Sequence, residues 1–464
     1  MIRAGAEGGS SGTLAVHAGP WGTGSLYAVA QGEELHADWD PSRLYHLLGQ
    51  DCLDPLRAAV FLARLDTPYS QRTLLRDMRL LTAGSHSTWP ASDNRAQALH
   101  IAYPPPVDLP RIGRIAPDGD VAGAFWKTLG ASMKRWVGPG GAADGDWAAG
   151  ELSGGLDSSV VMACAATLTG QPLRTYGLTM PGAQRARQQV RRAELIDRFG
   201  LADATRPLEA DPPLSPVGAR ALARGVVPWE ECYHESVSAL FATAAADGVR
   251  SLFTGFGGDE LCTPHPHDGL ADPENGPTST SPEYAPIPQH LSHTAKEMLH
   301  DAMADQVSAF DPAPQGHVAE SAVESVTSGS ALYLRHGIWP VHPLCTPELF
   351  RLCQRLPGQW RSGRTVQRDL LTRLGFPSIS RPDGEDDFSP VMAAALRGPS
   401  RPLLTDLFKN SLLADTRLID PRVLSSGYQQ WADGGPGDEL PFYSAAILEL
   451  TLRSVEAAGQ EHLS

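Results

Sequence analysis

The stretch ELSGGLDSSVVMACAA, Glu151–Ala166, places two glycines and four small polar or acidic residues directly before an apolar helical run. A short strand is expected to end near Leu152, and a helix is expected over about residues 158–168. A glycine turn between a strand and a helix exposes backbone N–H groups at the positive end of the helix dipole. Glycine also lets the backbone approach a ligand closely. The pattern therefore predicts an anion site, and the serine hydroxyls suit phosphate oxygens.

Asp157 lies inside this motif, although a carboxylate repels a phosphate. A Mg²⁺ ion that bridges the carboxylate and the phosphate would resolve this conflict. The motif differs from the Walker pattern because no lysine follows the glycines. The alternative interpretation is a glycine-rich strand–helix turn that binds nothing.

A second glycine cluster, TGFGGDEL at Thr254–Leu261, follows another expected strand. The carboxyl ends of parallel strands face one crevice, where ligands bind in this class of fold. Asp259 is therefore the predicted second Mg²⁺ ligand, opposite Asp157. The alternative for Asp259 and Glu260 is an acidic pair at the start of a helix.

The wider pattern alternates strands and helices. A strand is expected at Thr175–Met180, a helix that ends at Gly200, and a further helix at 231–248. This alternation favours an α/β fold with a parallel sheet covered on both faces. After Lys296 the pattern is mainly helical, with breaks at prolines, and 262–290 is expected to form a long loop.

Composition limits the classes of partner. The chain has 464 residues and a formal net charge of −15, which makes nucleic acid and anionic membrane poor partners. No apolar run is long enough for a signal peptide or a spanning helix. The six cysteines are scattered without a CxxC pair, so neither a disulfide framework nor a zinc site is expected. We therefore expect a cytoplasmic protein.

The two glycine motifs together resemble the synthetase domain of asparagine synthetases, within the PP-loop ATP pyrophosphatase family. This group also includes β-lactam synthetases and lasso-peptide cyclases. The resemblance covers roughly residues 121–410. It implies a parallel-sheet PP-loop (adenine nucleotide α-hydrolase-like) synthetase domain with a helical C-terminal part, over 116–464. A short degenerate glutaminase-like α+β domain would precede it, over 12–115.

The resemblance also implies ATP and Mg²⁺ as cofactors. In the family, a carboxylate attacks the α-phosphate of ATP, and an amine then displaces AMP from the acyl-adenylate. Asp157 and Asp259 would hold the metal, and Leu178 would contact the adenine base. The residues implied in binding the nucleotide are Ser153, Gly154, Gly155, Asp157, Ser158, Ser159, Leu178, Gly255, Gly257 and Gly258.

The sequence departs from the family pattern at several positions. Ile2 stands where glutamine-hydrolysing members have their cysteine nucleophile, so glutamine hydrolysis is not expected. Glu385 aligns with the usual catalytic lysine, and Phe256 replaces a glutamate that is common in the second motif. Tyr333 is a candidate to act beside a carboxylate as a base that deprotonates the amine. The residues that could supply the missing cation are Arg364, Arg368, Arg381 and Lys409.

These features predict an AMP-forming amide synthetase for a natural product or a peptide macrolactam, resembling a lasso-peptide cyclase. Its substrate would be a small-molecule or peptide carboxylate, and its partners would include a precursor peptide with a protease or recognition protein. One alternative is an ammonia-dependent asparagine synthetase. Another is a non-catalytic nucleotide-binding member of a biosynthetic complex, because Glu385 and Phe256 alter the site.

Overall fold

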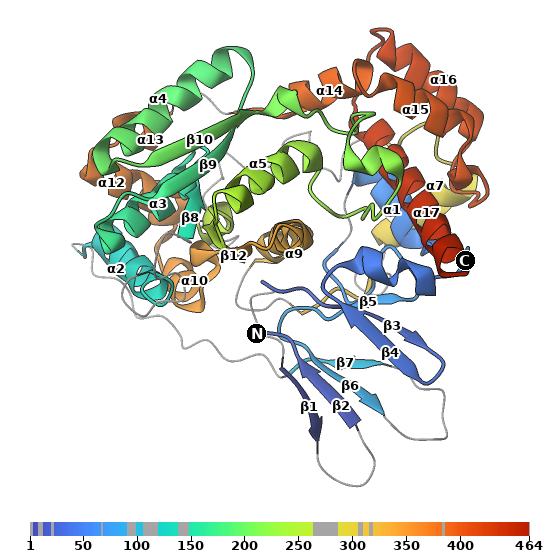
Figure 1. The fold of residues 1–464 in the computed structure, drawn as a ribbon, viewed down its shortest axis with the longest axis horizontal. Helices are drawn as coiled ribbons and strands as arrows, with labels where there is room; N and C mark the ends of the chain where they lie inside the picture. Colours follow the sequence, from blue (N-terminus) through green and yellow to red (C-terminus); the bar gives the residue numbers. More distant parts are fainter. Residues whose placement is uncertain are drawn as a thin grey trace.

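The computed structural model describes eleven segments of the chain (Figure 1), which are residues 3–7, 13–19, 23–65, 68–90, 99–104, 119–137, 148–262, 286–304, 310–314, 319–382 and 386–463. A parallel sheet with its helices forms one part of the molecule. Small antiparallel sheets from the N-terminal region form a second part, and C-terminal helices form a third (Figure 1).

The parallel sheet has five strands in the order β10-β9-β8-β11-β12. The strands are β8 (Ala148–Glu151), β9 (Arg174–Thr179), β10 (Ala202–Pro207), β11 (Ser251–Phe253) and β12 (Trp339–Val341). The expected α/β class is thus confirmed. The strand β12 was not expected from the sequence, because Pro340 indicated only a break. An edge strand tolerates a proline, since a proline there need not cost a hydrogen bond of the ladder.

Helices cover both faces of this sheet. On one face lie α2 (Val121–Met133), α3 (Leu156–Thr169), α4 (Gly182–Phe199) and α12 (Thr365–Leu374). On the other face lie α5 (His234–Ala246) and α9 (Glu320–Arg335). Successive residues of β8 serve opposite faces, as the pleat requires: Ala148 packs with the first group and Ala149 with the second. The central strand is therefore buried on both sides.

Two antiparallel sheets form the N-terminal region. One has the order β1-β2-β6-β7 and the other the order β4-β3-β5. Their strands are β1 (Arg3–Glu7), β2 (Thr13–His17), β3 (Tyr27–Gln31), β4 (Glu34–Asp38), β5 (Met78–Leu80), β6 (His86–Pro90) and β7 (His100–Ala102). The helical elements of this region are η1 (Pro41–Leu47) and α1 (Pro55–Arg64).

The remaining helices mostly follow the sheet strands in sequence. The longer ones are α7 (His293–Ala304), α10 (Pro347–Gln354), α14 (Ser389–Arg397), α15 (Arg401–Lys409), α16 (Pro421–Ala432) and α17 (Leu440–Leu463). The short ones are α6 (Gly258–Leu261), α11 (Gly358–Arg361) and α13 (Pro377–Ser380). Short 3-10 turns are η2 (Leu208–Ala210), η3 (Ala219–Leu222), η6 (Pro343–Cys345), η7 (Ser362–Arg364) and η8 (Leu412–Ala414).

One hydrophobic core joins the two ends of the chain. Tyr27 of β3, Leu44 of η1 and Phe61 of α1 share a cluster with Leu404 of α15 and Tyr443 of α17. Burying these side chains from both ends in one cluster removes a large apolar surface from water, which is the main force that holds them together. The sheet β4-β3-β5 is therefore attached to the C-terminal helices.

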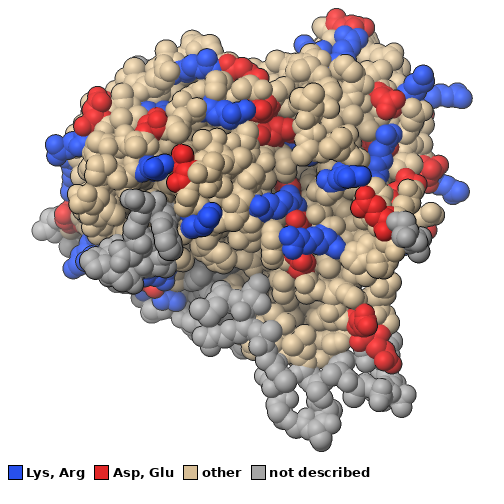
Figure 2. Space-filling model, viewed as in Figure 1, with Lys and Arg blue, Asp and Glu red and all other residues tan. Residues whose placement is uncertain are grey.

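The surface mixes charges of both signs. On the face in Figure 2, acidic and basic side chains are interspersed over the described residues. Among the helices that the structure describes, none combines the length and the apolar character that crossing a bilayer requires.

Candidate functional site

The first glycine motif forms a tight turn between β8 and α3. The Ser153 Oγ accepts a hydrogen bond from the Gly155 N–H at 3.1 Å and lies 2.9 Å from the Ser158 Oγ. Gly154 has a φ of +82°, in the left-handed region that favours glycine. Ser159 is fully buried, and its hydroxyl makes no hydrogen bond to the part of the chain that the structure describes. The turn thus places serine hydroxyl groups and backbone N–H groups at the start of α3.

Helix α4 holds this turn from behind. The Gln188 Nε2 donates to the carbonyl of Ser153 at 2.8 Å, and the Arg191 Nε donates to the carbonyl of Gly154 at 2.8 Å. In a trans peptide the N–H points opposite to the C=O. The N–H of Gly154 therefore faces away from α4, whereas the N–H groups of Ser153 and Gly155 donate to the hydroxyl groups of Ser158 and Ser153 within the turn.

The second glycine turn packs directly against the first. A Cβ on Gly255 would lie 2.7 Å from the backbone nitrogen of Ser158, and a Cβ on Gly258 would lie 2.1 Å from the Asp157 Oδ1. Gly257 has a φ of +91° and borders Cys345, whose Sγ would lie 2.5 Å from an added Cβ. Only hydrogen atoms fit at these three positions, so the glycines allow two turns that are distant in sequence to meet.

This contact brings Asp157 and Asp259 together. Arg364 bridges them: its Nη1 lies 3.2 Å from the Asp157 Oδ2 and also contacts Asp259. The Gln367 Nε2 donates to the Asp157 Oδ1 at 2.8 Å. Burial raises the pKa of Asp157, and the neighbouring charge of Asp259 raises it further, whereas Arg364 lowers it. Two carboxylates thus face each other here, and Arg364 supplies the positive charge that compensates them.

The donor set at this pair suits Mg²⁺. Carboxylate oxygens are hard ligands, and Mg²⁺ is commonly held by one or two carboxylates plus phosphate oxygens and water. Within the described ranges, the structure contains no group of three or more His, Cys, Asp or Glu side chains placed to hold a metal. A cation at Asp157 and Asp259 would therefore take its remaining ligands from phosphates and water.

Tyr333 reaches the same edge of the sheet from α9. Its hydroxyl donates to Glu151, the last residue of the central strand β8 and a direct neighbour of the glycine turn. Tyr333 is buried and its ring packs on Phe241 with centroids 4.2 Å apart, which fixes the hydroxyl. Burial raises the pKa of Glu151 to about 7, although the hydrogen bond from Tyr333 lowers it. A carboxylate with this pKa can accept and release a proton near neutral pH.

The remaining predicted site residues do not all lie at the two glycine turns. Leu178 is half-buried near the carboxyl end of β9, and its carbonyl accepts from the Gln188 Nε2 at 3.0 Å. Phe256 contacts the ring of His342, with centroids 5.7 Å apart. Glu385 lies outside the described residues, as does most of the predicted loop at 262–290.

Among the four cations predicted as substitutes for the missing lysine, Arg364 reaches the paired carboxylates. Arg368 instead donates to the backbone carbonyls of Gly363 and Ser380. Arg381 follows α13, and Lys409 ends α15.

Sequence reasoning missed several residues of this site, namely Glu151, Gln188, Arg191 and Gln367. Two of them, Gln188 and Arg191, share a helical spacing with Arg192 in the sequence. In the structure all three side chains are buried. Polar side chains on the buried face of a helix need partners, so such a stripe indicates contact with another polar element. Glu151 carries a weaker signal, as a carboxylate at the end of a strand otherwise made of Ala and Gly.

Residues 148–331 match the family model described as asparagine synthase. The matched residues include strands β8, β9, β10 and β11 of the parallel sheet. No curated protein matches the sequence. A solved structure of the U34-tRNA thiolase NcsA from Methanococcus maripaludis with its 4Fe-4S cluster aligns at 12% identity, over 71% of this chain and 88% of that chain. The TM-score of this alignment is 0.28, and we infer nothing about this chain from it.

Proposed function

We propose, for a chain whose residues 148–331 form a domain of the asparagine synthase type, that it activates a carboxylate with ATP and transfers the acyl group to an amine. The observation that carries this proposal is the meeting of the two glycine turns, with Gly258 against Asp157. This contact places backbone N–H donors and the paired carboxylates side by side at the edge of the sheet.

In the activation step, an oxygen of the substrate carboxylate attacks the α-phosphorus of ATP. The bond from the α-phosphorus to the bridging oxygen breaks, and pyrophosphate leaves. The N–H of Gly154 holds the leaving pyrophosphate, and the hydroxyl groups of Ser153 and Ser158 turn from each other to donate to it. Asp157 and Asp259 would hold a Mg²⁺ ion, which when bound draws negative charge from the phosphates. Leu178 offers an apolar contact to the base.

In the transfer step, the amine nitrogen attacks the acyl carbon. The C–N bond forms, the bond from carbon to the phosphate oxygen breaks, and AMP leaves. The ammonium proton must be removed first, because a protonated amine has no free electron pair. Glu151 accepts this proton, and Tyr333 orients the carboxylate and stabilises its charged form.

Arg364 supplies the positive charge that the family usually takes from a lysine. Its guanidinium already lies at the paired carboxylates, and it stays protonated at any pH of interest. It can therefore stabilise the negative charge that develops on the phosphates, but it cannot carry a proton. This leaves the proton transfer to Glu151 and Tyr333.

ATP–pyrophosphate exchange tests the proposal. The purified protein is incubated with ATP, Mg²⁺, labelled pyrophosphate and a panel of amino-acid, small-molecule and peptide carboxylates. Exchange with at least one carboxylate is expected, and Asp157→Asn should abolish it. Asp51→Asn, at an exposed position away from the turns, is the matched control and should exchange normally.

Two outcomes would favour the other candidates. Formation of asparagine from aspartate, ATP and ammonium would identify an ammonia-dependent asparagine synthetase. ATP binding without exchange for any carboxylate would indicate a non-catalytic nucleotide-binding partner. A natural-product or peptide carboxylate as the substrate that exchanges would support a macrolactam synthetase.

A further inference from the structure

A cavity of about 310 Å³ lies between the N-terminal sheets and the parallel-sheet domain. Its walls come from β3 and β5, the segment after α1, residues 228–232, and the first half of α9 at residues 324–328. Its volume lies at the lower end of the range for small-molecule sites, which is about 300–1,000 Å³. A water-sized molecule such as ammonia occupies about 30 Å³. The cavity is therefore much larger than ammonia requires.

Aromatic side chains form a fixed part of its wall. The rings of Tyr27 and Trp229 stack with centroids 5.6 Å apart, and the Trp229 Nε1 donates to the Tyr27 hydroxyl at 2.9 Å. The Tyr69 hydroxyl accepts from the N–H of Ala83 at 2.9 Å. Tyr69 and Trp229 thus give the lining aromatic surface, which suits an apolar skeleton or a cation.

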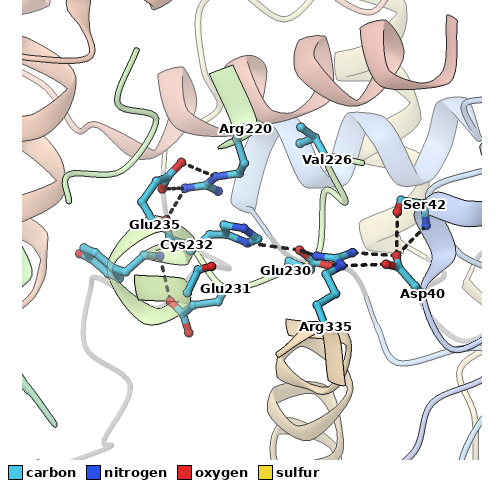
Figure 3. A network of polar contacts seen from close by, with 12 residues as sticks. Asp40, Ser42, Arg220, Val226, Glu230, Glu231, Cys232, Glu235 and Arg335 are labelled. Carbon is cyan, nitrogen blue, oxygen red and sulfur yellow. Dashed lines mark hydrogen bonds and ion pairs between the residues drawn. The ribbon is translucent and has the colours of Figure 1, made fainter. Parts of the chain in front are cut away.

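Two adjacent glutamates of the cavity wall, Glu230 and Glu231, have different partners. Glu230 belongs to a buried network in which Arg335 pairs with both Glu230 and Asp40, at 2.8 and 2.7 Å (Figure 3). Its charge is thus matched within the protein. The carboxylate of Glu231 points away from Arg335 in Figure 3 and accepts a hydrogen bond from the backbone N–H of Tyr233 at 2.9 Å. Glu231 is thus a carboxylate of the lining that does not pair with Arg335, and the lining also contains Arg72 and Glu324.

The cavity adjoins the proton-accepting pair. Helix α9 lines the cavity with Thr327 and Ser328 and carries Tyr333 about one and a half turns further on. Glu230, the neighbour of Glu231, pairs with Arg335 of the same helix, and the charge of Glu231 raises the pKa of Glu151 and Tyr333. An amine held at Glu231 would thus lie within electrostatic reach of the carboxylate that takes its proton.

We infer that this cavity binds the amine substrate, and that this substrate is a primary organic amine with an aromatic or similarly sized apolar skeleton rather than ammonia. This inference rests on the proposed amide synthesis. Glu231 pairs with the ammonium group, and the rings of Tyr69 and Trp229 contact the skeleton. The ammonium passes one proton to Glu151, and the neutral nitrogen then attacks the acyl carbon. The bond from this carbon to the phosphate oxygen breaks, and AMP leaves with the second proton of the nitrogen on its phosphate.

Calorimetric titration with tyramine, in the absence of ATP, tests this inference. The wild-type protein should bind tyramine saturably, and 4-ethylphenol, which lacks only the amino group, should bind at least about tenfold more weakly. Glu231→Gln should weaken tyramine binding by about tenfold or more. Glu33→Gln, at an exposed position in the turn between β3 and β4, is the matched control and should bind as the wild type does.

A second variant covers the case in which Glu231→Gln does not fold. Ser328→Phe fills the cavity without removing a charge, and it should also lose tyramine binding. The inference is overturned if wild-type protein does not bind tyramine saturably, or if neither variant weakens binding. ATP–pyrophosphate exchange requires no amine, so a failure of exchange counts against the proposed function, whereas a failure of tyramine binding counts against the amine cavity.

Discussion

Glu151→Gln should stabilise the protein at pH 8 but not at pH 4. Glu151 ends the central strand and is half-buried beneath α9, and burial raises its pKa from 4.5 to about 7. The folded protein therefore binds this proton more tightly than the unfolded chain does. The resulting stability is fully present below about pH 4.5 and is lost as the pH rises through about 7, where the buried carboxyl must become charged.

The size of the effect follows from the shift in pKa. The rise in the pKa of Glu151 from 4.5 to about 7, at about 1.4 kcal/mol for each tenfold change in the proton affinity, corresponds to about 3.5 kcal/mol of lost stability above pH 7. Glutamine has nearly the same shape and never ionises. The variant should avoid this loss, and its advantage should disappear at low pH.

Thermal unfolding at several pH values between 4 and 8 measures the effect. The Tm of Glu151→Gln should exceed that of the wild type by several degrees at pH 8 and match it at pH 4. Glu33→Gln, an exposed control, should show no such trend. Tyr333→Phe removes the hydrogen bond that favours the charged carboxylate, so it should move the pH-dependent loss to higher pH. A difference in Tm that is the same at pH 4 and pH 8 would refute the reasoning.

Three further changes have expected outcomes. Gly258→Ala places a Cβ 2.1 Å from the Asp157 Oδ1, so it should weaken Mg·ATP binding by about tenfold or more in a titration. Gly49→Ala is the control: its added Cβ would have no atom within 4 Å, and this variant should bind Mg·ATP normally. Arg364→Gln leaves two facing carboxylates without their bridge, so the affinity for Mn²⁺ without nucleotide, measured by electron paramagnetic resonance, should rise by about tenfold; an unchanged affinity would contradict the bridging role. Arg335→Ala removes the arginine that pairs with two buried carboxylates, Asp40 and Glu230. It should destabilise the protein by about 3–5 kcal/mol in denaturant unfolding, and a loss below 1 kcal/mol would show that the network is not needed.

The strand–turn–helix at Glu151–Ala166 could be predicted because its determinants are local. The apolar run, the glycines and the helix start lie within sixteen consecutive residues, and β8 and α3 begin and end close to the expected positions. The end of α4 at Gly200 was also predicted correctly, since a glycine with a φ of +63° closes the helix.

Contacts between distant parts of the chain could not be predicted in this way. The hydrogen bond between Tyr333 and Glu151 joins residues 182 positions apart, and the contact between Arg364 and Asp157 joins residues 207 apart. Nothing in the local sequence of α9 shows which strand its tyrosine meets. A carboxylate beside Tyr333 was predicted, but its identity depends on how α9 packs on the sheet.

The core shared by β3, α1, α15 and α17 affects how the chain folds during synthesis. Tyr27 and Phe61 leave the ribosome long before Tyr443 of α17, which belongs to the same cluster. Until then, the early apolar side chains lack part of their native cover, and such surfaces promote aggregation. We expect the nascent segment with β3 and α1 to require a chaperone, or slow assembly, until α17 arrives.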